Sequence, residues 1–157
     1  MEIFGKSTIN PILYWTGKAA GVINWAVITI CMIKMVSAGW NLWEYYHYIA
    51  FVVMIIALII IAFSLINLGS STRVGLPKED TNLKINGLYK FSRNPIYVGG
   101  DLLIIASIIC TLNVWVAIMG IYSLIVYHLI ILGEEKFLKK RFGEEYLQYI
   151  QKVRRYI

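Results

Sequence analysis

Two short polar stretches carry the residue types and spacing needed for binding chemistry. The first, residues 87–100, leads from a basic loop into an apolar segment. Asn94 followed by Pro95 favours a helix start, with Asn94 as the N-cap and Pro95 at the first helical position. The free N–H groups and the dipole at such an end bind anions, and Arg93 lies beside them. The alternative is simple capping, with Arg93 bound to a lipid headgroup.

The second stretch is the acidic pair Glu134-Glu135, at the end of another apolar segment. Negative charge is disfavoured near a helix C-terminus, so a cationic partner from the protein or from a ligand is expected. His128 precedes Glu135 by seven residues and shares its helix face. It is a candidate base, or else a hydrogen-bonded packing residue. Asp101 lies one turn into an apolar helix, where a carboxylate marks either a functional site or a paired structural group.

The elements that must position these residues are membrane helices. Hydrophobic residues make up 59% of the 157 residues and charged residues only 15%, which is outside the usual range of soluble domains. A helix that crosses the bilayer needs roughly 20 apolar residues. Four blocks approach that length: Ala19 to Gly39, Tyr48 to Leu68, Ile96 to Leu112, and Val114 to Leu132. We therefore expect an all-α, polytopic membrane protein of about four transmembrane helices, forming a single domain over residues 1–157.

The basic residues indicate how the helices are oriented. Residues 69–93 and the tail from Glu134 each carry more lysines and arginines than acids, whereas the connections near residues 41–47 and at Asn113 carry none. The positive-inside rule then places both termini and both polar stretches in the cytoplasm. The same rule accounts for the net charge of +6 without a nucleic-acid partner.

Several further expectations concern single segments. Residues 1–18 are predicted to form an interfacial arm, and Cys31 and Cys110 to be small buried hydrophobic residues. No cysteine cluster or HExxH motif occurs, so no metal site is expected. After Glu135, apolar residues recur at helical spacing, at Leu138, Phe142, Tyr146, Tyr149 and Val153. They predict an amphipathic C-terminal helix that lies on the membrane surface or folds back over the site.

Together the two polar stretches resemble a motif of integral-membrane methyltransferases, the group of isoprenylcysteine carboxyl methyltransferase and phospholipid N-methyltransferase. The family pattern is L-x-x-x-G-x-Y-x-x-x-R-H-P-x-Y-x-G, an apolar hairpin, then E-E-x-x-L-x-x-x-F-G-x-x-Y-x-x-Y. The matching residues here are Leu83, Gly87, Tyr89, Arg93, Asn94, Pro95, Tyr97 and Gly99, then Glu134, Glu135, Leu138, Phe142, Gly143, Tyr146 and Tyr149. The resemblance covers roughly residues 76–157. Residues 1–68 would then be a two-span scaffold, and residues 69–157 the cofactor loop, helical hairpin and C-terminal helix.

The resemblance implies S-adenosylmethionine as the methyl donor. The residues expected to bind it are Thr81, Asn82, Leu83, Lys84 and Tyr89 in the loop, Asn94, Pro95, Ile96 and Tyr97 at the helix start, and Glu134 for its amino group. Arg93, His128 and Glu135 are the candidate catalytic residues. His128, Asp101 or Glu135 would serve as the base if the acceptor has to lose a proton.

The expected reaction is methyl transfer to a lipophilic acceptor at the cytoplasmic membrane face. The acceptor would be a lipid-like or prenyl-type carboxylate, amine or thiol. Two departures bear on its identity: Asn94 replaces the family's histidine, and Ile130 stands where prenylcysteine enzymes carry an arginine. The alternatives are a non-catalytic membrane module of the same fold and a nicotinamide-dependent membrane reductase. The sequence does not indicate an oligomeric state.

Overall fold

The apolar blocks of the sequence form four α-helices in the computed structural model, which describes residues 9–39, 43–69 and 83–157. The helices are α1 (Pro11–Ala38), α2 (Tyr45–Leu68), α3 (Pro95–Thr111) and α4 (Val114–Lys152), with a 3-10 helix, η3 (Gly87–Lys90), before α3. No strand occurs in these ranges, and one isolated bridge pairs Ser92 with Arg154. The expected all-α class is confirmed.

Local sequence sets the helix starts. Asn10 accepts a hydrogen bond from the Ile12 amide at 2.9 Å, and Pro11 occupies the first helical position of α1. Asn113 caps α4 in the same way, accepting from the amide of Trp115 at 2.9 Å. Side-chain caps of this kind satisfy amides that have no partner within the helix. The α3–α4 connection is only Leu112 and Asn113, which confirms the expected antiparallel hairpin.

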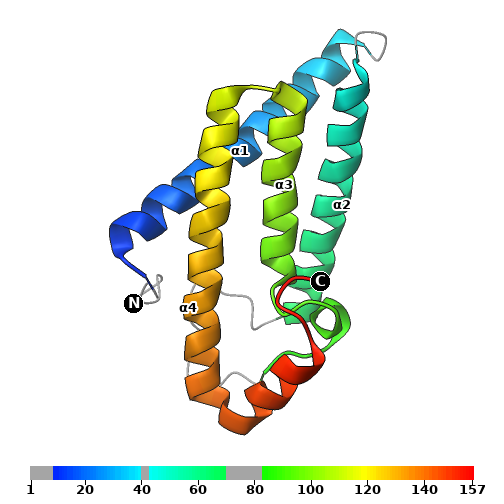
Figure 1. Ribbon diagram of the computed structural model, residues 1–157. Helices are drawn as coiled ribbons and strands as arrows, with labels where there is room; N and C mark the ends of the chain where they lie inside the picture. Colours follow the sequence, from blue (N-terminus) through cyan, green and yellow to red (C-terminus); the bar gives the residue numbers. More distant parts are fainter. Residues whose placement is uncertain (1–8, 40–42, 70–82) are drawn as a thin grey trace.

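Three helices, α1, α2 and α4, are long and apolar enough to cross a membrane. The fourth, α3, has 17 residues, a length of about 25 Å at 1.5 Å per residue. It packs against α1, α2 and α4, so it is the central helix of the bundle (Figure 1). Gly99 makes the contact with α2 possible, because a Cβ there would lie 3.0 Å from the Ala57 carbonyl oxygen.

Two expectations about single segments are wrong. Helix α1 begins at Pro11, so residues 11–18 belong to a continuous long helix and not to an interfacial arm. Cys31 and Cys110 are joined by a disulfide between α1 and α3, where two separate thiols were expected. They are 79 residues apart in sequence, and only the packing of α1 on α3 brings them together.

Helix α4 extends past the ends of the other helices, and the chain then turns back toward the start of α3 (Figure 1). The turn is at Gly143, whose φ of 52° and ψ of −122° are not helical and suit glycine alone. Beyond it, Tyr146, Tyr149 and Val153 form a buried cluster against Leu83, Leu138, Phe142 and Ile150. The predicted stripe is therefore a packing surface, and the C-terminal segment folds back over the polar residues.

Candidate active site

The buried carboxylate of Glu135 lies between two arginines. Arg93 donates to its Oε1 from Nη2 at 2.9 Å and from Nε at 3.1 Å. Arg155 donates to its Oε2 from Nη2 at 2.9 Å and from Nε at 3.1 Å. The Arg93 and Glu135 side chains are only 7% and 10% exposed. Buried charges need such partners, since an unpaired one would cost several kcal/mol. The cation expected beside the acidic pair thus comes, for Glu135, from the protein.

Arg93 also holds the C-terminal tail in place. Its Nη1 donates to the carbonyls of Val153 at 3.2 Å and Ile150 at 3.4 Å, where the last helical turn leaves acceptors without partners. Its backbone amide donates to the carbonyl of Arg154 at 3.0 Å. One guanidinium therefore connects the segment before α3, the middle of α4 and the tail. A direct part for Arg93 or Glu135 in catalysis stays a prediction.

Asn94 occupies the N-cap of α3, as expected, but its side chain makes no capping hydrogen bond. Its Nδ2 donates instead to Glu135 Oε1 and to the Arg155 carbonyl, both at 3.3 Å. The charged carboxylate is the stronger acceptor, so the amide turns toward it. The N-terminus of α3, with Pro95 at its first position and Ile96 in its first turn, is left without a side-chain cap.

Glu134 has a different environment from its neighbour. The Tyr97 hydroxyl donates to its Oε1 at 2.9 Å, and it forms no salt bridge with any residue that the structure describes. Lys18 of α1 lies within electrostatic range of it, and donates its own hydrogen bond to the Tyr14 hydroxyl. Glu134 is therefore a largely enclosed carboxylate that can still receive a cationic ligand.

His128 lies deeper in the bundle, two turns before Glu135 on α4. Its Nδ1 is 2.6 Å from the Tyr156 hydroxyl, and the two rings stack. His128 and Glu135 thus share a helix face, as the spacing predicts, and both contact the returning tail.

The described loop residues among those expected to bind the donor, Leu83, Lys84 and Tyr89, lie apart from this cluster. Thr81 and Asn82 lie outside the described residues. Tyr89 is buried, and its carbonyl accepts from the Tyr149 hydroxyl at 2.6 Å. Burial raises the pKa of Tyr89 to about 12. Its ring packs inside the protein, and Tyr89 does not line the cavity found beside it.

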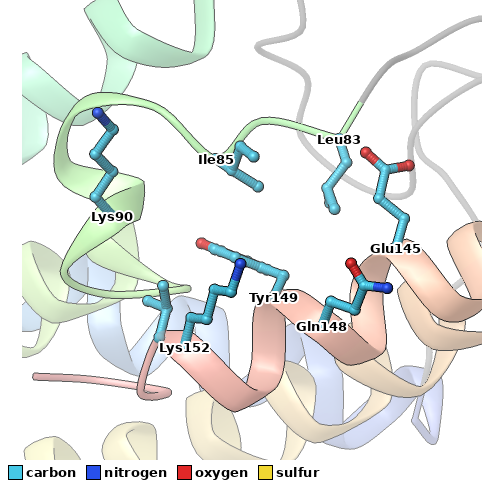
Figure 2. Close-up of a pocket in the computed structure, with 8 residues that line it drawn as sticks. Leu83, Ile85, Lys90, Glu145, Gln148, Tyr149 and Lys152 are labelled. Atoms are coloured by element: carbon cyan, nitrogen blue, oxygen red, sulfur yellow. The ribbon is translucent and has the colours of Figure 1, made fainter.

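That cavity has a volume of about 380 Å³ and lies between the loop and the last turns of α4 (Figure 2). Leu83 lines it, as do Ile85, Lys90, Glu145, Gln148, Tyr149, Lys152 and Val153. Lys84, the next expected loop residue, is half-buried beside Leu83 and is absent from the lining. The cavity borders the Arg93 cluster through Val153, whose carbonyl accepts from Arg93.

Sequence reasoning missed four residues of the site. They are Lys18, Ser92, Arg155 and Tyr156, none of which carries a motif that the sequence alone would single out. Ser92 accepts from the Asn94 amide at 3.1 Å and donates to the Arg155 carbonyl at 3.3 Å. Serine is a common turn residue, but the sequence does not indicate which residues of the tail contact it.

Comparison with known proteins identifies the family of the chain. A family model described as phospholipid methyltransferase matches residues 45–145. Over 150 residues the chain is 30% identical to Methanethiol S-methyltransferase 1 of Bradyrhizobium diazoefficiens, covering 90% of this chain and 48% of that protein. The chain thus spans about half the length of this curated relative. The match to the family model includes α2, α3, the acidic pair and the turn of α4. The chain belongs to the phospholipid methyltransferase family, a family of integral-membrane methyltransferases.

Proposed function

We propose that the protein transfers a methyl group from S-adenosylmethionine to a lipophilic acceptor at the cytoplasmic face of the membrane. One observation carries the proposal. The Glu134 carboxylate, held by Tyr97, lacks a salt bridge among the described residues and lies near a helix N-terminus that has no side-chain cap. These two features match the ammonium and the carboxylate at the amino-acid end of the donor.

The donor-binding residues in this proposal are Glu134, Tyr97 and the first turn of α3 with Pro95 and Ile96. Asn94 acts through Glu135 and the tail. When bound, S-adenosylmethionine supplies a methyl group already activated on a sulfonium. The protein then has to align the acceptor and exclude water. The network of Arg93, Glu135 and Arg155 closes the tail over the site, and the closed tail aligns the acceptor and excludes water.

A thiol is the acceptor class that the comparisons support best. The relative named as a methanethiol S-methyltransferase matches nearly the whole chain, whereas the family model described by phospholipids stops at residue 145. Ile130 is fully buried between helices. An isoleucine at this position provides no positive charge for an acceptor carboxylate. The proposed catalytic unit is a single domain over residues 1–157, with residues 69–157 carrying the site.

Binding of S-adenosylhomocysteine, measured by calorimetry in detergent, tests the donor site. Glu134→Gln keeps the shape and removes the charge, so we expect affinity to fall about 10- to 100-fold, the value of a charged hydrogen bond of about 1.5–3 kcal/mol. Glu144→Gln, an exposed glutamate after the Gly143 turn, is the matched control and should bind as the wild type does. Equal affinity in Glu134→Gln would remove Glu134 from the site.

Transfer of labelled methyl groups tests the reaction itself. The purified protein is given a long-chain thiol, phosphatidylethanolamine or a prenylcysteine in separate assays. We expect label in the thioether product and little in the carboxyl ester. Binding of S-adenosylhomocysteine with no label in any product would favour the non-catalytic module, and absence of binding would contradict the proposal altogether.

A further inference from the structure

A second layer of polar side chains lies inside the bundle, behind the donor site. On α4, Tyr127 and His128 precede Glu134 and Glu135 by seven residues. On α3, Asp101 follows Tyr97 by four. Both spacings keep residues on one helix face, and seven residues correspond to about 10 Å along the axis. The inner layer is therefore the next one reached from Glu134 toward the middle of the membrane.

Asp101 is the unexplained member of this layer. Its Oδ1 is buried and has no hydrogen-bond partner among the described residues. A buried polar atom without a partner costs about 1–3 kcal/mol, and a carboxylate within a membrane helix costs more. The close approach of α3 to its neighbours occurs beside this group, at Gly99 against Ile61 of α2 and at Gly100 against Trp25 of α1.

The C-terminal tail completes the inner layer. The Tyr156 hydroxyl is 2.6 Å from His128 Nδ1, and its ring stacks on the imidazole with centroids 6.0 Å apart. Burial, and then the negative charge of Asp101, raise the pKa of Tyr156. Asp101 thus lies within electrostatic range of Tyr156. Asp101 also lies within electrostatic range of Tyr127 on α4.

We propose that Asp101 is a catalytic residue that contacts a thiol acceptor and takes its proton, with His128 and Tyr156 as positioning residues. The inference rests on the proposed function and names the acceptor group and the base for it. As the thiol sulfur forms its bond to the methyl carbon, the bond from that carbon to the donor sulfur breaks, and the S–H proton passes to Asp101 Oδ1. The products are a thioether, the neutral donor thioether and a protonated Asp101.

The charge of Asp101 discriminates between acceptor classes. An acceptor carboxylate or phosphate would be repelled in a site of low dielectric. An ammonium would pair with Asp101 and be stabilised in its protonated form, which is not nucleophilic. A neutral thiol enters an apolar site at little cost and becomes the stronger nucleophile once its proton is removed.

The titratable and polar groups around the inner layer come from α1, α3, α4 and the tail. Helix α4 presents Tyr127 and His128, and the tail presents Tyr156. Helix α3 has Tyr97 one turn earlier, bonded to Glu134, and α1 presents the Trp25 indole, which donates to the Gly100 carbonyl at 3.0 Å. Toward the donor site α1 adds Tyr14 and Lys18, bonded to each other. Helix α2 contributes apolar side chains at Gly99.

The test compares wild type with Asp101→Asn, using 1-hexanethiol as the acceptor. S-adenosylhomocysteine affinity should stay within about 2-fold, because Asp101 is not in the donor layer. Methylation near neutral pH should fall about 100-fold or more, the usual contribution of a general base. The loss should shrink as pH rises toward the pKa of the thiol, because the thiolate then forms without a base. Asp101→Glu should restore part of the activity near neutral pH.

A binding measurement provides a readout apart from turnover. In the wild-type complex with S-adenosylhomocysteine, 1-hexanethiol should bind more tightly than hexyl methyl sulfide, which has no S–H to donate. Asp101→Asn should lose that preference. Tyr156→Phe tests the positioning residues, and this variant should lower kcat about 10-fold with little change in KM. Its result can be interpreted even if Asp101→Asn does not fold.

Four results would overturn the inference. The first is a wild type that binds S-adenosylhomocysteine but methylates no thiol. The second and third concern Asp101→Asn: a loss of methylation activity that is equal at every pH, or full activity. The fourth is an unchanged kcat in Tyr156→Phe. A wild type that does not bind S-adenosylhomocysteine would instead contradict the proposed function, so the two failures are distinguishable.

Discussion

At the scale of single residues, the two members of the acidic pair have separate tasks although they are adjacent in sequence. Glu135 is neutralised by Arg93 and Arg155 and serves to join three segments. Glu134 receives only a tyrosine hydroxyl among the described residues and remains available to a cation. Successive helix positions point about 100° apart, so one carboxylate faces the tail and the other faces α3.

The planar fork of Arg93 is what allows one side chain to bind Glu135 and two carbonyls together. Arg93→Lys keeps the charge but offers a single ammonium, so at least one of these acceptors loses its partner. We expect a loss of about 1–3 kcal/mol in unfolding free energy and a lower Tm in detergent. Arg154→Lys, at a neighbouring exposed arginine, should leave the Tm unchanged. Equal Tm values in the two variants would show that the fork is dispensable.

At the scale of elements, the turn at Gly143 decides where the tail goes. A continued α4 would carry Arg155 away from Glu135 and Tyr156 away from His128. The positive φ at Gly143 is what permits the reversal. The burial of Tyr146 and Tyr149 against Leu83 then holds the reversed segment against the loop.

Gly143→Ala places a Cβ where the backbone conformation disfavours it, at a cost of about 1–3 kcal/mol. We expect the segment after residue 143 to leave its position, with faster trypsin cleavage at Lys152 and Arg154 and lower affinity for S-adenosylhomocysteine. Glu144→Ala, one residue later and exposed, should resist trypsin as the wild type does. Unchanged cleavage in Gly143→Ala would mean that packing alone holds the tail.

At the scale of the whole molecule, the start of α3, the acidic pair on α4 and the returning tail gather at one end, and the α3–α4 turn lies at the other (Figure 1). Lys90 and Arg93 of the basic loop and the basic residues of the tail belong to the first end. From the positive-inside rule we predict that this end, with the proposed active site, faces the cytoplasm.

Labelling of introduced cysteines tests this orientation. In a background of Cys31→Ala and Cys110→Ala, we expect Asn113→Cys to react with a membrane-impermeant maleimide in intact cells. Glu144→Cys should react only after the membrane is opened. The reverse pattern would place the site outside the cytoplasm.

The sequence by itself determined that the chain folds into apolar helices, and it determined the tight α3–α4 connection and the family. Apolar length, Asn94-Pro95 as a helix start and the two spaced motifs are local patterns, and membrane helices satisfy their backbone hydrogen bonds locally. Tertiary structure alone decided which charges meet. Arg155 reaches Glu135, Tyr156 reaches His128, and Lys18 approaches Glu134 because α1 crosses α4 and the tail reverses at Gly143. Contacts between distant segments depend on how helices pack, and no local pattern encodes their partners. Asp101 shows the same division: its cost in a membrane helix is readable from sequence, but its missing partner is visible only in the fold.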